Sequence, residues 1–243
     1  MEVHHHAHSA RKKWTHYFWE FLMLFLAVFC GFLAEYKLEH KIESDRAGEY
    51  AELFLEDLKN DSAYINQLLA SQEYMLTHAD SLLNLLSGNQ YSGNNYEVVD
   101  HFNKISAFID FNPAFPVNFE QAKNSGSLRY IKNRELISAL SSLNREMEII
   151  EEVCGGYNDH IKQYLTPFAI EHFNTLQYDI FSRKVLVSNP EIYKWDSETA
   201  VMLANKVNLK KTYDIFFINH FFPNCLNKIK SLAASIANEY HLE

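Results

Sequence analysis

The feature that most constrains this chain is an apolar stretch near its N-terminus, residues 21–34, which contains no charged side chain. A helix of this length measures roughly 21 Å, which is shorter than the ~30 Å hydrocarbon core of a bilayer. Extending the helix back to Trp14 lengthens it to about 31 Å and places Trp14, Tyr17 and Trp19 at one interface as an aromatic belt. The sequence therefore predicts a transmembrane helix over residues 14–34.

Insertion of this helix into lipid is favourable despite one acidic residue. The stretch contains nine Leu, Phe or Val residues, which favour insertion by roughly 3–5 kcal/mol in total. Glu20 opposes insertion by up to ~3 kcal/mol, and by less near the edge of the span. A short uncharged run also permits the alternative interpretation, a core helix of a soluble protein.

Basic residues on one side of the span predict its orientation. Arg11, Lys12 and Lys13 precede the span, and the positive-inside rule assigns such a cluster to the cytoplasm. Residues 1–13 are then a basic, His-rich cytoplasmic tail, and residues 35–243 lie on the far side of the membrane. No small-x-small cleavage site follows the apolar run, so we expect an uncleaved signal anchor.

One face of the predicted span carries an acidic residue and several small ones. Its members recur every three or four residues: Glu20, Leu24, Ala27, Gly31 and Ala34. The Ala27-xxx-Gly31 pair permits close approach of two helix backbones, and a carboxyl on the same face can hydrogen-bond to a partner helix. This face, called the seam below, indicates a self-associating or partner-binding helix. In the alternative, Glu20 reaches to the interface and the small residues are incidental.

The net negative charge of residues 35–243 limits the kinds of molecule that this part of the chain can bind. Residues 35–243 carry 19 basic and 29 acidic residues, whereas residues 1–34 carry three basic and two acidic ones. An acidic domain is a poor partner for nucleic acid, whose phosphates require clustered Lys and Arg. Anionic lipid headgroups would also repel it, which suits a domain held beside a membrane rather than lying on it.

The rest of the chain predicts one all-α domain, an antiparallel helical bundle. Only 7 Gly and 5 Pro are present, which favours long helices over a many-stranded fold. Apolar residues at three-four spacing predict a long amphipathic helix from Ser44 or Asp45 to Leu86. We expect further helices over 97–109 and 119–123, from an N-cap at Asn133 with an interruption at Gly155-Gly156, from Asp196 or Ser197 to Val207, and over 209–240 with a kink at Pro223. A short extended piece is expected at 184–187.

Aromatic residues in a Pro-rich segment suggest a possible ligand pocket. Residues 110–117 include Phe111, Phe115 and Pro116, and this segment could rim an apolar pocket together with Tyr130. In the alternative, these aromatic side chains seal one end of the bundle.

Candidate metal-binding and catalytic residues are sparse. His4, His5, His6 and His8 could bind Zn²⁺, Ni²⁺ or Cu²⁺, or could belong to a polar tail with only adventitious affinity. The other histidines show no metal-ligand spacing: His101, His160, His172 and His220. Cys154 and Cys225 are expected as unpaired buried thiols, and a bridge between them is the alternative. We therefore predict no metal site, no cofactor and no enzymatic activity.

Three segments of the chain form a recognisable set: residues 17–22 (YFWEFL), 55–61 (LEDLKND) and 119–133 (FEQAKNSGSLRYIKN). Together they resemble a family of uncharacterised single-pass membrane proteins of Bacteroidetes-type bacteria. The resemblance implies an inner-membrane anchor and a periplasmic helical domain. It implies no activity, substrate or catalytic residue.

Two functions are consistent with these observations. The leading hypothesis is a membrane-anchored structural or interaction module that binds the lipid bilayer through its span and associates with a protein partner or with a second copy of itself. The alternative is an extracytoplasmic ligand-sensing domain. Because few residues precede the span, such a domain would have to signal through a partner protein.

Overall fold

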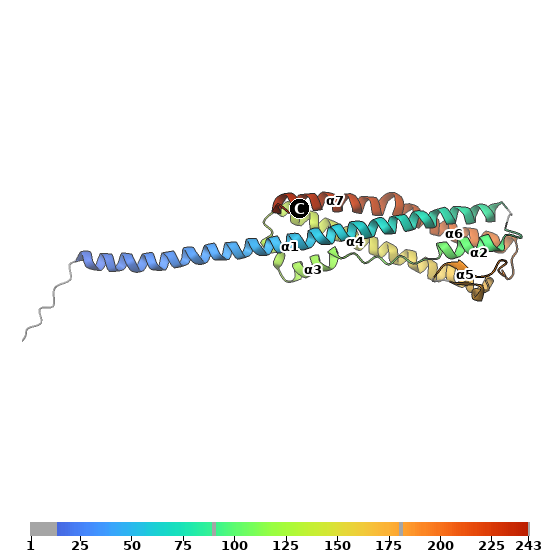
Figure 1. Ribbon diagram of the computed structural model, residues 1–243, viewed down its shortest axis with the longest axis horizontal. Helices are drawn as coiled ribbons and strands as arrows, with labels where there is room; N and C mark the ends of the chain where they lie inside the picture. The colour runs from blue at the N-terminus through green and yellow to red at the C-terminus, as the bar shows by residue number, and fades with distance from the viewer. Residues whose placement is uncertain (1–13, 89–90, 180–181, 243) are drawn as a thin grey trace, which may run out of the picture. The chain divides into compact units, whose positions relative to one another are not determined.

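The computed structural model describes residues 14–88, 91–179 and 182–242, and the chain divides into two units, Met1–Glu49 and Tyr50–Glu243. Helix α1 (Trp14–Ser87) supplies all of the first unit that is described and also the first helix of the second unit (Figure 1). The structure is mostly helical, as predicted. The predicted span and the predicted amphipathic helix are parts of this one uninterrupted helix.

In the described part of the second unit, six further α-helices and short connecting elements follow α1. The α-helices are α2 (Asn95–Ile105), α3 (Phe115–Asn124), α4 (Arg134–His160), α5 (Thr166–His172), α6 (Ser197–Phe216) and α7 (Phe222–Tyr240). Short 3₁₀ turns are η1 (Ser127–Tyr130) and η3 (Thr175–Gln177), and π-helical turns are η2 (Ile161–Leu165) and η4 (Phe217–Phe221). Strands β1 (Tyr178–Asp179) and β2 (Lys184–Val185) form an antiparallel pair, so the predicted extended piece is present.

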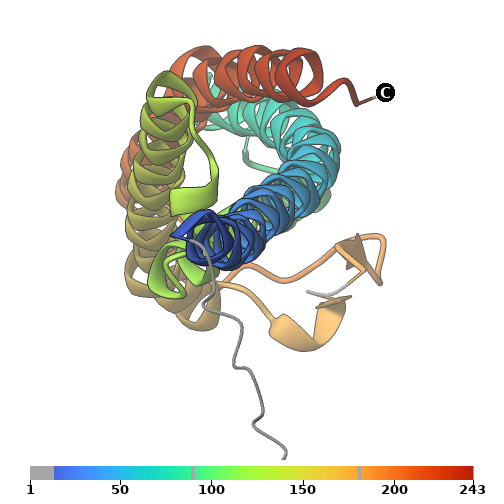
Figure 2. The same cartoon turned by 90° about the vertical axis from the view of Figure 1, so that its left-hand side faces the viewer.

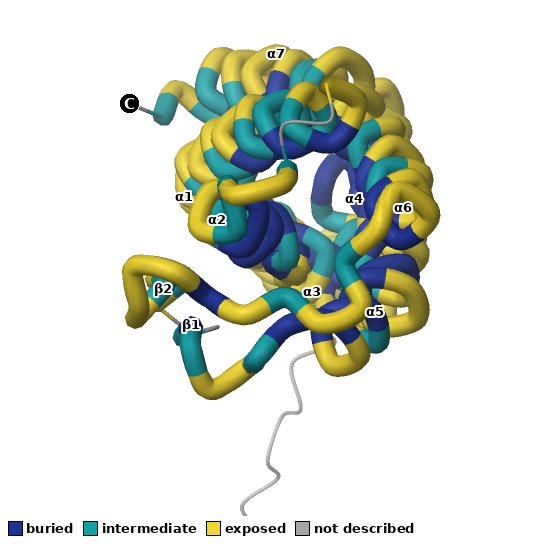
Figure 3. Tube along the Cα trace, turned by 90° about the vertical axis from the view of Figure 1, so that its right-hand side faces the viewer, coloured by how far each residue is buried: buried dark blue, intermediate teal, exposed yellow. Residues whose placement is uncertain are grey.

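The helices of the second unit surround a common core of buried apolar side chains (Figures 2 and 3). Two polar contacts fix how α4 lies along α6 and α7. Asn133, before α4, donates to Glu239 near the end of α7 at 2.6 Å, and His160 at the end of α4 lies 3.1 Å from the Lys206 carbonyl on α6. Residue numbers therefore rise along α4 as they fall along α6 and α7.

Two prolines lie within continuous helical segments, and a π turn precedes each of them. Pro167 follows η2 and Pro223 follows η4, in each case after one intervening residue. That intervening residue donates its backbone N–H to the carbonyl five residues back. A proline in a helix lacks the N–H donor, and its ring clashes with the carbonyl four residues back. The wider π turn accommodates the ring, so the helix continues past Pro223, where a kink was predicted.

The predicted interruption of α4 at Gly155-Gly156 is wrong. The helix continues to His160 without a break, although each glycine costs about 1 kcal/mol relative to alanine in a helix. Cys154 and Tyr157 flank the pair and are both buried in the core. Packing of these neighbours overrides the low helix propensity of the two glycines.

Helix α2 ends earlier than predicted, at Ile105 rather than Ile109. The Ser106 hydroxyl donates to the Phe102 carbonyl at 2.7 Å. It thereby takes the place of the backbone N–H that would bond to this carbonyl in a longer helix. The side chain of Asn158 accepts from the backbone N–H of Ile109 and donates to its carbonyl, both at 2.8 Å. Ile109 thus stays buried outside the helix because a distant side chain satisfies its backbone.

Other helix limits follow the capping rules. Asn133 accepts from the backbone N–H groups of Glu135 and Leu136, and Asp196 accepts from that of Thr199, so both predicted N-caps are confirmed. The predicted end of the helix at Val207 is wrong, because α6 continues to Phe216.

Helix α3 begins four residues earlier than predicted because a carboxylate from α1 caps it. Asp61 accepts from the backbone N–H groups of Ala114 and Phe115, at 2.7 and 2.9 Å. One turn earlier, Asp57 accepts from the side chain of Asn118 at 2.8 Å. A negative charge at a helix N-terminus satisfies free N–H groups and favours the helix dipole. The two acidic side chains therefore fix α3 against α1.

We predict that Asp61→Ala lowers the free energy of unfolding by about 2–3 kcal/mol, because the buried N–H group of Phe115 and the part-buried N–H group of Ala114 lose a charged acceptor. Glu56→Ala, an exposed acidic residue of the same helix, is the matched control and should have little effect. Urea denaturation of the full chain in mild detergent, followed by circular dichroism, measures both. Equal stability of the two variants would contradict the capping role of Asp61.

Candidate functional site

The first unit presents an unburied apolar helix surface. Within the described residues, α1 is the one helix long and apolar enough to cross a membrane, and none of its most apolar window is buried. Phe21, Met23, Leu24 and Phe32 are each about two-thirds exposed. The stretch therefore does not pack as a core helix in this structure, which was the soluble alternative.

All five seam residues are exposed: Glu20, Leu24, Ala27, Gly31 and Ala34. Glu20 is paired, because its Oε1 atom lies 3.1 Å from Nε2 of His16, one turn earlier. Sequence reasoning missed His16, although its spacing of four residues from Glu20 was visible. A Cβ atom added at Gly31 would meet nothing within 4 Å, so packing within the described chain does not require glycine there.

Both phenylalanines of the predicted pocket lie in the core. Phe115 is fully buried, with ring centroids 5.7 Å from Phe54 and 5.5 Å from Phe119. Phe111 is also buried and stacks on Phe222 at 6.4 Å. The Asp61 cap draws this segment onto α1, and the pocket at these residues stays a prediction.

The other two residues of the predicted pocket lie outside this aromatic cluster. Pro116 occupies the first turn of α3, where a missing N–H costs little. Tyr130 ends η1, and the Arg129 guanidinium lies 5.0 Å from the centre of its ring.

The cysteines of the second unit are free thiols. Cys154 and Cys225 are both buried and unbridged, and burial raises the pKa of each thiol from 9.0 to about 12. Both are therefore poor nucleophiles, since the thiolate is the reactive form.

Histidines do not form a metal site in the part of the chain that the structure describes. No group of three or more His, Cys, Asp or Glu side chains there could hold a metal ion. The cluster of His4, His5, His6 and His8 lies outside the described residues. His172 and His160 bond to backbone carbonyls, and His220 is exposed.

His101 does meet another histidine, which the sequence did not indicate. Its Nδ1 atom lies 2.9 Å from Nδ1 of His78, and this pair joins α2 to α1. Burial lowers the pKa of both side chains, and the nearby Lys104 ammonium lowers them further, whereas Asp100 acts in the opposite direction. One ring must be neutral to accept the hydrogen bond, so the contact depends on low protonation.

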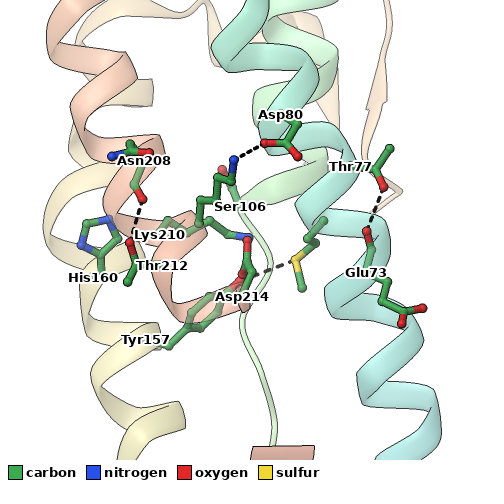
Figure 4. A network of polar contacts seen from close by, with 12 residues as sticks. Glu73, Thr77, Asp80, Ser106, Tyr157, His160, Asn208, Lys210, Thr212 and Asp214 are labelled. Atoms are coloured by element: carbon green, nitrogen blue, oxygen red, sulfur yellow. Dashed lines mark hydrogen bonds and ion pairs between the residues drawn. The ribbon is translucent and has the colours of Figure 1, made fainter. Parts of the chain in front are cut away.

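A polar network lies in the core of the second unit (Figure 4). Lys210 donates to both carboxylate oxygens of Asp214, at 2.9 and 2.8 Å, and both side chains are fully buried. The Lys210 ammonium also lies 5.3 Å from the ring centre of Tyr157 on α4. Burial lowers the pKa of Lys210 and raises the pKa of Asp214, while their mutual attraction opposes both shifts.

Helix α1 contributes two side chains to the same network. The Tyr157 hydroxyl lies 3.5 Å from the Met75 sulfur and also hydrogen-bonds to Gln72. Gln72 is almost fully buried, and its Oε1 atom has no hydrogen-bond partner among the described residues. Three helices, α1, α4 and α6, thus meet around one buried ion pair.

We predict that Asp214→Ala lowers the free energy of unfolding by about 3–5 kcal/mol, because it leaves the Lys210 ammonium buried without a counterion. The double variant Lys210→Met/Asp214→Leu should recover most of this loss, since apolar residues of similar size replace a buried pair at little cost. Chemical denaturation of the three proteins tests this. A double variant as unstable as the single one would show that the pair stabilises the core directly.

We predict that the His78–His101 pair makes stability fall as pH drops. Because burial lowers the folded-state pKa of both rings below 6.5, the unfolded chain binds protons first as pH falls from 7 through 6.5. The pair's contribution is therefore present above 6.5 and is lost below it. His78→Gln/His101→Gln should flatten the curve of thermal midpoint against pH between 7 and 5. His220→Gln keeps the pair and so should keep its contribution.

Comparisons with known proteins supply no relative for this architecture. No family model, no curated protein and no solved structure matches the chain. The resemblance to single-pass membrane proteins therefore stays a prediction, and function is argued from geometry and chemistry.

Proposed function

We propose that this protein is a non-enzymatic, membrane-anchored interaction module. In this proposal residues 14–34 span the inner membrane with the N-terminus in the cytoplasm. Residues 35–243 form a periplasmic domain, an antiparallel helical bundle, and the span pairs with the span of a second copy. The observation that carries the proposal is the apolar window of α1, none of which is buried by the residues that the structure describes.

Exposed apolar surface supports the anchor. Soluble monomers rarely expose contiguous apolar patches larger than a few hundred Å², whereas here a whole helical stretch is apolar and exposed on every face. A second unit of 194 residues already has its own core, formed without this stretch. Such a helix is stable in lipid, because its backbone N–H and C=O groups are hydrogen-bonded within the helix.

The distribution of side chains around the span supports self-association through the seam. Phe21, Phe25 and Phe29 stack along the helix at 6.2 and 5.9 Å, so that face is bulky. Ala27 and Gly31 are small and lie on a different face, where two backbones can approach closely. The His16–Glu20 pair lies at the edge of the span, where pairing lowers the cost of a carboxyl group in lipid.

We predict that an Ala27→Cys chain without its native Cys30 (Cys30→Ser) remains with alkali-washed membranes and forms a disulfide-linked dimer on mild oxidation. Phe29→Cys in the same background is the matched control. It lies away from the seam and should give at least fivefold less dimer. Adding Gly31→Ile to the Ala27→Cys chain should suppress the dimer, because a branched side chain separates the backbones. Non-reducing gel electrophoresis of washed membranes measures all three.

Two results would contradict different parts of the proposal. Recovery of the chain in the soluble fraction would exclude the anchor. A membrane-bound chain that crosslinks equally through positions 27 and 29 would exclude the seam but leave the anchor in place.

A further inference from the structure

The second unit contains a cavity of about 220 Å³ that neither the anchor nor the polar network uses. It lies where α2, the segment after α2, α5 and strand β1 come together, at the end of the unit that Figure 3 faces. Its apolar walls are the rings of Phe102 and Phe108 and the methyl group of Ala169. Protein interiors are otherwise packed closely, so a space of roughly seven water volumes is a candidate ligand site.

One wall of the cavity is held rigidly. The Phe102 ring packs edge-on against Phe173 at 4.9 Å and lies 6.3 Å from Phe168. Phe102 is also buried, whereas Phe108, the second aromatic residue of the lining, is about half exposed. The cavity therefore has a fixed aromatic inner wall and a second aromatic ring near its opening.

Four polar side chains line the cavity, and their unused bonding capacity indicates what it accepts. They are Asn103, Ser106, Thr166 and Tyr178. Asn103 is almost fully buried and donates its Nδ2 to the Asp179 carbonyl at 3.1 Å, which leaves its Oδ1 free to accept. Ser106 donates its only proton to the Phe102 carbonyl, so its oxygen can likewise only accept. The free acceptor atoms of Asn103 and Ser106 therefore favour a ligand that carries a hydrogen-bond donor.

Tyr178 adds a hydroxyl donor to the lining of the cavity. The residue as a whole is buried, but its hydroxyl makes no hydrogen bond to any described residue and is not one of the buried polar atoms without a partner. The hydroxyl is therefore accessible. Burial of the residue raises the pKa of this hydroxyl, so it stays protonated and can donate to a ligand oxygen.

We propose that this cavity binds a small, uncharged aromatic molecule with a hydroxyl group, of the size of a substituted phenol. Among the described residues, no Asp, Glu, Lys, Arg or His side chain lines the cavity, so a charged group would lose its water without gaining a counterion there. A phenolic hydroxyl donates to Asn103 Oδ1 and accepts from Tyr178, while its ring packs between Phe102 and Phe108. The volume limits the ligand to on the order of ten non-hydrogen atoms.

The experiment uses the full chain in lipid nanodiscs with ¹³C-labelled alanine methyl groups. The Ala169 methyl resonance reports on the cavity wall, and an Ala169→Ser variant assigns it. p-Cresol is the probe, and p-xylene, which has a methyl group in place of the hydroxyl, is the matched apolar compound. Each probe partitions into lipid to the same extent for every variant, so ratios of apparent affinity between variants cancel this effect. Affinities of the two probes are compared with each other on the free aqueous concentration of each probe.

We expect p-cresol to shift the Ala169 resonance saturably and to bind at least fivefold more tightly than p-xylene. Tyr178→Phe should weaken p-cresol binding about five- to tenfold and leave p-xylene unchanged, because only the hydroxyl is lost. Thr166→Leu adds apolar bulk at an exposed position of the lining and should weaken both probes at least tenfold. Tyr96→Phe, an exposed tyrosine of α2 outside the cavity, should change neither.

Three results would overturn the proposal. One is the absence of a saturable shift up to the solubility limit of p-cresol in the wild-type chain. The second is equal affinity for p-cresol and p-xylene. The third is unchanged affinity in both Tyr178→Phe and Thr166→Leu, with a dispersed alanine spectrum showing that these variants are folded.

Discussion

The second unit depends on polar contacts made by the part of α1 that follows residue 50. Asp61 caps α3, Gln72 reaches Tyr157 on α4, and His78 bonds to His101 on α2. An α-helix rises 1.5 Å per residue, so Asp61 and His78 are about 25 Å apart along the axis of α1. Between them the apolar face of α1 packs into the core, with Ile65 and Met75 fully buried. One long helix thereby sets the spacing of the others.

The same helix has a different composition before residue 35, and this difference determines the function that we propose. In the second unit, polar residues cover one face of α1 and apolar residues the other, as expected for a helix at the surface of a core. In the span, apolar side chains surround the helix, and the charged group within it, Glu20, is paired with His16. A helix that is apolar on all faces is stable in a protein core or in lipid. The described residues bury none of the apolar window of α1, and for this reason we propose an anchor.

Features set by local sequence were predictable. Asn133 and Asp196 cap their helices through side-chain contacts to the following turn, and such contacts follow from residue type and spacing. The long apolar pattern after residue 44 likewise predicted a helix that the structure contains. The segments 55–61 and 119–133 lie far apart in the sequence, yet the structure brings Asp57 of the first beside Asn118, immediately before the second.

Features set by distant contacts could not be predicted in this way. Phe115 begins a helix because Asp61, more than fifty residues earlier, accepts its N–H, and the spacing of neither residue indicates this. Gly155-Gly156 stays helical because its neighbours are buried. The cavity is formed by side chains from four separate segments, and the sequence does not indicate that these segments meet. The sequence instead predicts a pocket at Phe111 and Phe115 from their aromatic side chains alone, without knowledge of the residues that pack against them. Lys210 and Asp214 were visible at a spacing of four residues, but their complete burial was not.

The cavity lies next to one of the contacts that hold α1. Phe102 lines the cavity, and the preceding residue, His101, bonds to His78 on α1. Asn103, the residue after Phe102, holds the β1 strand through the Asp179 carbonyl. Asn103, which would accept from the ligand, is therefore already held by a hydrogen bond within its own chain, so this side of the cavity needs little rearrangement on binding. A ligand that binds a preformed site loses no affinity to a population of closed states. It can influence α1 only if its affinity differs between two arrangements of α2, and the His78–His101 hydrogen bond is the contact through which α2 and α1 would change together.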